Sequence, residues 1–160
     1  MEKKMEKKME KKKLEKIAKS IVSNSATVVY SAVVIDKSDR DKILKDAVHP
    51  NEYGEHMTLK YYGNDGPTET PYAGSRVNMT LKKHYADDKG DAWTIDCSDP
   101  VVAELKDQNQ TLHVTVSCAD GTKPVYSNTL IRTAKPDDKE GFAVKGRIGY
   151  FMSNRTWFFG

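Results

Sequence analysis

The sequence contains few cysteines and no long apolar run, and each of these absences excludes a class of protein. Cys97 and Cys118 are its two cysteines, and neither belongs to a CxxC pair or to the Cys/His spacing of a zinc site. We expect two reduced thiols that pack as small apolar side chains. No stretch approaches the ~18 consecutive apolar residues of a membrane helix. A helical membrane protein is therefore excluded, and no membrane partner is expected.

Several sequence motifs of catalysis and targeting are also missing. The chain has no P-loop, GxGxxG, HExxH or GxSxG string and no cluster of carboxylates. ATP use and metallohydrolysis therefore have no support, and we expect neither a cofactor nor a metal site. The basic N-terminus is followed by no apolar signal-peptide region, and it contains glutamates but no arginine, unlike a mitochondrial presequence. This pattern favours a cytoplasmic protein.

The positive charge is concentrated at one end of the chain. The formal net charge is +3, from 26 Lys and Arg against 23 Asp and Glu. Residues 1–19 contain nine lysines and four glutamates, net +5, which leaves 17 positive and 19 negative charges, net −2, in residues 20–160. The body of the protein therefore has no overall field that attracts phosphate, and stable DNA binding is not expected.

At 160 residues the chain is long enough for one domain with a core, and two independent domains are not expected. Residues 1–22 form a basic leader with three MEKK repeats, and Leu14, Ile17 and Ile21 fall on one stripe of a predicted amphipathic helix. Residues 23–160 form the predicted single domain.

Strand-like segments outnumber helical ones in residues 23–160. A helix is predicted over 39–47, capped by Ser38, and another over 100–106, preceded by Asp99. Alternating or β-branched runs predict strands over 27–35, 56–62, 76–85, 92–98, 111–118, 125–133, 142–151 and 156–159. Strands interrupted by helices favour an α+β fold in which helices cover a sheet.

The most informative pattern is a repeated tripeptide, His56-Met57-Thr58 and His113-Val114-Thr115. Side chains of a strand alternate between its faces, so each motif presents an imidazole and a hydroxyl side by side. Two surface strands that carry unrelated polar residues are the plainer interpretation. The two other histidines lack the pattern, which favours a shared site.

These strings carry a family resemblance. HMTLKYYG (56–63) and LHVTVS (112–117) resemble the two signatures of the 2H phosphoesterase superfamily. The resemblance implies a bilobal α+β fold, with antiparallel or mixed sheets, flanking helices and both motif strands along a central groove. It also implies metal-independent hydrolysis of phosphodiesters in nucleotides or RNA.

The residue chemistry agrees with that implication. Cleavage beside a ribose 2′-hydroxyl needs a base for this hydroxyl and an acid for the leaving 5′-oxygen. His56 and His113, with ordinary pKa values near ~6.5, suit these two roles, which the sequence does not assign individually. Thr58 and Thr115 are the predicted donors to the phosphate oxygens.

A narrower resemblance links the early VVYSAVV strand to the phage anti-CBASS nucleases, which degrade cyclic oligonucleotide messengers. It implies cyclic di- or trinucleotide substrates, the host cytoplasm as location, and nucleotide-binding roles for Tyr30 and Glu140. Lys60 is a further candidate for holding phosphate, and Trp157 for stacking on a base. Core packing for Tyr30 and Trp157 and a solvated loop charge for Glu140 are the plainer alternatives.

Two other functions stay open on the sequence alone. The first is an RNA-end 2′,3′-cyclic phosphodiesterase of RNA processing or repair. The second is a non-catalytic nucleic-acid-binding module whose basic tail supplies the affinity, which predicts binding that weakens steeply with salt. The sequence does not determine the oligomeric state, the base preference or the linkage cleaved.

Overall fold

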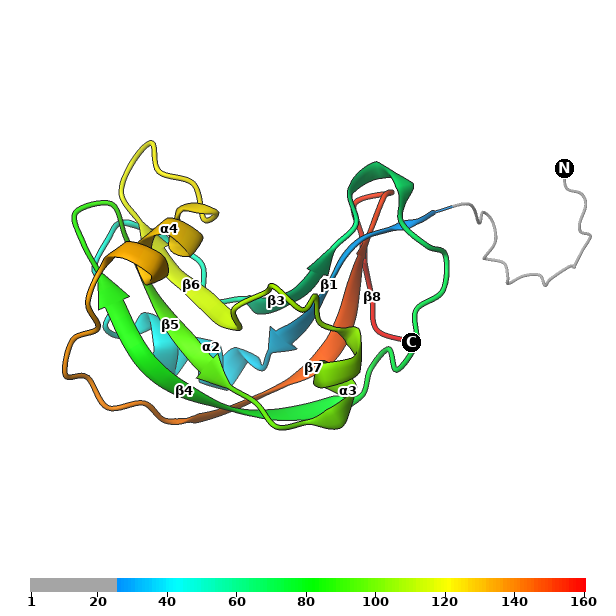
Figure 1. Cartoon of the computed structure of the whole chain (residues 1–160), viewed down its shortest axis with the longest axis horizontal. Coiled ribbons are helices and arrows are strands. Elements are labelled where there is room, and N and C mark those ends of the chain that lie inside the picture. Colours follow the sequence, from blue (N-terminus) through cyan, green and yellow to red (C-terminus); the bar gives the residue numbers. More distant parts are fainter. Residues whose placement is uncertain (1–25) are drawn as a thin grey trace, which may run out of the picture.

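The computed structural model describes residues 26–160, in which an eight-stranded sheet is the main element (Figure 1). The spatial order of the strands is β2-β6-β5-β4-β7-β1-β3, and β8 pairs with β7. Every neighbouring pair is antiparallel. The strands are β1 (Val28–Ile35), β2 (Asn51–Glu52), β3 (His56–Tyr61), β4 (Arg76–Ala86), β5 (Gly90–Asp96), β6 (His113–Cys118), β7 (Ala143–Met152) and β8 (Trp157–Phe158).

The helices of the described part are short. They are α2 (Lys37–Leu44), α3 (Pro100–Leu105), α4 (Tyr126–Thr133) and a 3₁₀ turn, η1 (Gly63–Asp65). This composition confirms the α+β class, and the sheet is antiparallel rather than mixed. Between residues 26 and 160, no helix has the length and apolar content required to cross a bilayer.

The sheet curls until its two ends meet. β3 and β6 stand at or near opposite ends of the strand order, yet they lie in contact without pairing to each other. Figure 1 shows two raised wings, one with β4, β5 and β6 and the other with β1, β7 and β8. Between β2 and β3, Tyr53 N–H donates to the carbonyl of Val116 and Gly54 N–H to that of Thr115, both at 2.8 Å. This connection starts β3 beside β6.

The core lies on one face of the curled sheet. Met57 and Leu59 of β3 are fully buried, and Val114 of β6 is 1% exposed, whereas the alternating His56 and Thr58 are half-buried on the other face. Ile43 of α2 and Val102 of α3 belong to the same apolar cluster. The alternation predicted for the two H-x-T strands therefore holds, and their polar faces point away from the core.

One predicted strand is wrong. Residues 125–133 carry the helix α4, although Val, Thr and Ile in VYSNTLIRT favoured a strand. The segment follows Pro124, buries Ser127 and Leu130 three residues apart, and has the Thr133 hydroxyl bonded to the Thr129 carbonyl at 2.8 Å. Burial of these two residues against β5 therefore outweighs the preference of β-branched residues for a strand, because local propensity is a weak preference that tertiary packing overrides.

The predicted cap of the first helix is also wrong. α2 begins at Lys37 after Asp36, and no side chain caps it. Asp36 instead accepts two hydrogen bonds from Arg76, at 3.0 and 2.5 Å. Asp99 does cap α3, accepting from Val101 N–H at 2.8 Å. Both cysteines are free, Cys118 buried and Cys97 half-buried, and the predicted leader helix in residues 1–22 lies outside the described residues.

Candidate active site

Both H-x-T motifs open into one groove of about 320 Å³. His56 and Thr58 come from β3, and His113 and Thr115 come from β6. The loop before β3, the end of β3, the loop before β6 and the start of α4 complete the wall with Tyr53, Glu55, Tyr61, Gln110, Pro124, Val125 and Asn128. Two pairs of side chains, from motifs 57 residues apart in the sequence, therefore meet on the face that the core leaves free.

The ring of His113 is held in one tautomer. Its Nδ1 lies 2.8 Å from the carbonyl oxygen of Thr111, an acceptor, so Nδ1 carries the proton and donates. Nε2 is therefore the nitrogen left for a ligand in the groove. Burial lowers the pKa of His113, and the hydrogen bond to the Thr111 carbonyl opposes that shift. The neutral ring is thus favoured near neutral pH.

His56 packs against aromatic rings. Its ring centroid lies 5.4 Å from that of Tyr30 and 5.7 Å from that of Trp157. Burial lowers the pKa of His56, the carboxylate of Glu55 opposes this, and a positive charge on His113 lowers it further. The last effect makes one protonated and one neutral ring more favourable than two cations.

The hydroxyl of Thr115 belongs to a short chain of hydrogen bonds. Its Oγ1 lies 2.7 Å from Oγ of Ser127 on α4 and 3.3 Å from the Pro124 carbonyl oxygen. When Ser127 donates to Thr115, the single proton of Thr115 is free to turn from the weaker Pro124 contact toward a ligand. Ser127, which is 3% exposed, therefore positions the Thr115 hydroxyl.

Aromatic side chains form a wall beside His56. Tyr30 of β1 stacks on Phe151 of β7 at 5.3 Å, and Trp157 of β8 meets the Tyr30 ring edge-on at 5.5 Å. Trp157 stacks in turn on Phe159 at 6.0 Å. The structure thus places Tyr30 and Trp157 against His56, where they form one packed group and each keeps part of its surface exposed.

The two other predicted binding residues lie elsewhere. Lys60 is on β3, but its Nζ lies 5.1 Å over the ring of Tyr62 and it does not line the groove. Glu140 lines a separate shallow depression with Lys82 and Lys83. The structure therefore brings His56, Thr58, His113 and Thr115 together, with Tyr30 and Trp157 adjacent, and leaves Lys60 and Glu140 outside the groove.

Several groove residues were missed from the sequence. Glu55 precedes the first motif, and Asn128 lies in the segment predicted as a strand. Tyr61 and Val125 are 69% and 70% exposed on the groove, and buried Ser127 lies behind it. The aromatic position in HMTLKYYG was a signal for Tyr61. No local pattern pointed to the α4 residues, because their place depends on how α4 packs.

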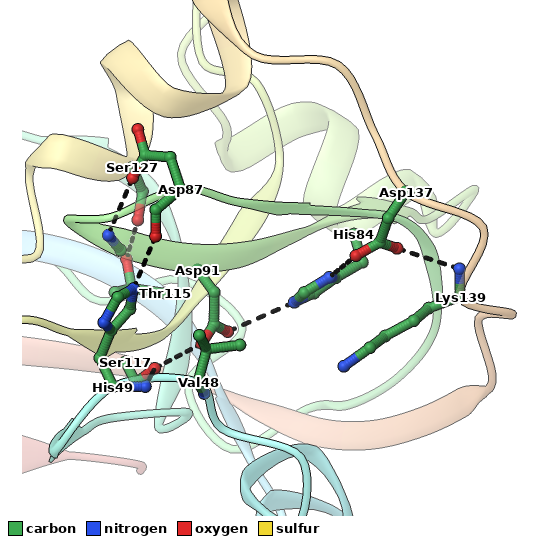
Figure 2. A network of polar contacts seen from close by, with 11 residues as sticks. Val48, His49, His84, Asp87, Asp91, Thr115, Ser117, Ser127, Asp137 and Lys139 are labelled. Atoms are coloured by element: carbon green, nitrogen blue, oxygen red, sulfur yellow. Dashed lines mark hydrogen bonds and ion pairs between the residues drawn. The ribbon is translucent and has the colours of Figure 1, made fainter.

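A buried polar network supports the wing that carries β6 (Figure 2). The fully buried carboxylate of Asp91 accepts from Ser117 Oγ and, at 2.8 Å, from Val48 N–H. His84 lies between two carboxylates, with Nδ1 2.6 Å from Asp137 and Nε2 3.4 Å from Asp91. Because Ser117 is two residues from Thr115 on the same strand, the network braces β6 next to the groove.

No family model and no curated protein sequence matches the chain. Among solved structures, the chain is similar to the crystal structure of a fungal RNA kinase, with 15% sequence identity and a TM-score of 0.49. The match covers 80% of this chain and 43% of that protein, so the chain spans less than half of its neighbour's length.

Proposed function

We propose that this protein is a phosphodiesterase of the 2H type, in which His56 and His113 act as the acid–base pair. One observation carries the proposal: two H-x-T motifs from distant parts of the sequence line the same groove. Two imidazoles beside two hydroxyls match the requirements of transesterification at a ribonucleotide phosphate, which needs a base, an acid and donors to the phosphate oxygens.

The proposed reaction begins at Nε2 of neutral His113. This nitrogen removes the proton of the ribose 2′-hydroxyl, the 2′-oxygen bonds to phosphorus, and the bond from phosphorus to the 5′-oxygen breaks. Protonated His56 delivers its proton to that 5′-oxygen, and the product carries a 2′,3′-cyclic phosphate. Thr58 and Thr115 donate hydrogen bonds to the non-bridging oxygens as their charge grows. Subsequent hydrolysis of the cyclic phosphate would use the two histidines in exchanged roles.

As substrates we propose cyclic oligonucleotides, such as cyclic di- or trinucleotides. The aromatic wall of Tyr30 and Trp157 supports this choice, because aromatic rings next to His56 offer a base a stacking surface worth ~1–3 kcal/mol. The body's net charge of −2 favours capture by local contacts over capture by a general field. An RNA 2′,3′-cyclic end is the alternative substrate.

Single replacement of either histidine tests the chemistry. His56→Ala and His113→Ala should each reduce turnover of a 3′,3′-cyclic dinucleotide by at least ~100-fold, the usual scale of acid–base catalysis. Circular dichroism should show an unchanged fold. His49→Ala is the control, because its ring bonds to the Asp87 carbonyl outside the groove. Full activity of either groove variant would refute the acid–base pair.

A substrate panel tests the specificity. Cyclic di- and trinucleotides and an RNA with a 2′,3′-cyclic end are incubated with the protein, with and without EDTA. Turnover of the cyclic oligonucleotides alone, unaffected by EDTA, is the expected result. Turnover of the RNA end alone would replace the proposed substrate by the alternative. Salt-sensitive binding that survives His113→Ala, without turnover of any compound, would indicate a nucleic-acid-binding module.

A further inference from the structure

Arg147 lies on the same row of the sheet as His56. In the registers of β1, β3 and β7, Val34 is the cross-strand partner of both His56 and Arg147. Directly opposed residues of an antiparallel pair share a face, so His56 and Arg147 project to the same side. Neighbouring strands are ~4.8 Å apart, which places their Cα atoms about 10 Å from each other.

Aromatic rings bridge this row above the sheet. Trp157 lies 5.7 Å from the ring of His56 and stacks on Phe159 at 6.0 Å, and the guanidinium of Arg147 lies 3.9 Å over the Phe159 ring. Gly149 makes this possible, since a Cβ at that position would lie 2.5 Å from the Phe159 ring. The C-terminal segment therefore holds the Arg147 side chain against a rigid surface.

The guanidinium of Arg147 has no carboxylate partner within ion-pair distance among residues 26–160. Its cross-strand neighbour Arg76 occupies both oxygens of Asp36. Arg147 is exposed, and stacking on Phe159 leaves its in-plane N–H donors available. A planar fork of free donors can form two parallel hydrogen bonds to a phosphate or a carboxylate.

We propose that Arg147 binds a second phosphate group of the substrate, one nucleotide away from the phosphodiester held by the two histidines. The inference rests on the proposed function. An oligonucleotide alternates phosphate and base, and this row presents the same alternation: His56, then the aromatic rings, then an unpartnered cation. A base on the partly exposed ring of Trp157 would place its two flanking phosphates near His56 and Arg147. Arg147 thus selects substrates with at least two phosphates.

Two compounds that differ by one phosphate test the proposal. A 3′,3′-cyclic dinucleotide has two phosphodiesters, whereas the dinucleoside monophosphate with the same bases has one. Arg147→Gln should raise KM for the cyclic compound by about tenfold or more, the scale of one charge-assisted hydrogen bond. It should leave kcat within about twofold and KM for the one-phosphate compound unchanged. If one of the compounds binds but is not turned over, its inhibition constant is measured in place of KM.

The controls separate a binding role from other effects. Arg155→Gln removes the same charge from the turn between β7 and β8, and it should change neither constant. Arg147→Lys keeps the charge but loses the planar fork, so its KM should lie between those of the wild type and Arg147→Gln. An equal loss on both compounds, or no change in KM, would overturn the second-phosphate site. Wild-type protein that neither turns over nor binds either compound would instead overturn the proposed function.

Discussion

At the scale of single residues, the two groove histidines differ in their surroundings. His113 is fixed by the carbonyl of Thr111, while His56 lies between aromatic rings and next to Glu55. Burial lowers the pKa of both rings. An enzyme that needs one neutral and one protonated imidazole is most active between the two pKa values, so these environments set its working pH.

We expect the optimum of kcat/KM to lie below pH ~6.5, the ordinary pKa of histidine. Both pKa values are lowered, so activity falls as the pH rises and the acid loses its proton. Glu55→Gln removes the carboxylate that raises the pKa of His56. In the plot of kcat/KM against pH, the limb that corresponds to titration of His56 should therefore move to lower pH. Rate measurements between pH ~4.5 and ~8.5, about 2 units on either side of the ordinary pKa of histidine, check this.

Glu52→Gln is the matched control for this profile. Glu52 is exposed on β2 and does not line the groove, so its replacement should leave the profile in place. A Glu55→Gln profile that coincides with that of the wild type would contradict the influence of Glu55 on His56.

At the scale of elements, the connection between β2 and β3 decides whether a groove forms. Gly54 N–H donates to the Thr115 carbonyl at 2.8 Å, and β3 starts at His56, two residues later. Gly54 has a φ of +67°, a conformation that costs other residues about 1–2 kcal/mol. This turn brings the first motif alongside the second.

Gly54→Ala should therefore destabilise the fold and reduce activity. A Cβ at this position would lie 3.0 Å from Leu44 of α2, so crowding adds to the backbone cost of about 1–2 kcal/mol. Gly121→Ala is the matched control, because Gly121 also has a positive φ, +84°, but a Cβ at that position would meet open space. Urea unfolding and kcat should show the larger loss for Gly54→Ala. Equal losses of unfolding free energy and kcat in both variants would mean that crowding against Leu44 contributes nothing to the effect.

At the scale of the whole molecule, one curled sheet carries both wings, and a buried polar network stiffens one of them. His84 is 2% exposed and lies between Asp91 and Asp137 (Figure 2). Burial alone would lower the pKa of His84, but the hydrogen bonds and charges of the two carboxylates outweigh it, and the pKa is raised. When the ring is protonated, both of its N–H groups can donate to these carboxylates, which joins β4, β5 and the loop before β7.

The stability of this wing should depend on pH in a defined direction. A histidine whose pKa is raised on folding stabilises the protein below its unfolded pKa of ~6.5, and this contribution is lost as the pH rises through the raised value. The difference in unfolding free energy between wild type and His84→Asn should thus be larger at pH 6 than at pH 9, two values on either side of ~6.5. Denaturant titrations at both pH values measure it.

His49→Asn provides the comparison for this experiment, because the His49 ring bonds to a backbone carbonyl rather than to a carboxylate. A difference for His84→Asn that is the same at both pH values would contradict a raised pKa for His84.

The local features of this protein follow from interactions between residues close together in the chain, and the amino-acid pattern predicts them. Alternation in HMTLKYY and LHVTVS predicted two strands with polar and apolar faces, and the Asp99-Pro100 start predicted α3, because both follow from interactions between near neighbours. The absence of motifs for other chemistries and the paired histidines also came from the sequence alone.

Which residues share the groove depends on tertiary contacts. The curl of the sheet brings β3 to β6, α4 forms where β-branched residues favoured a strand, and Lys60 turns to Tyr62 instead of the groove. These outcomes depend on contacts between residues far apart in the chain, which leave no local pattern. Arg147 and His56 are 91 positions apart and share a row solely because both strands pair with β1.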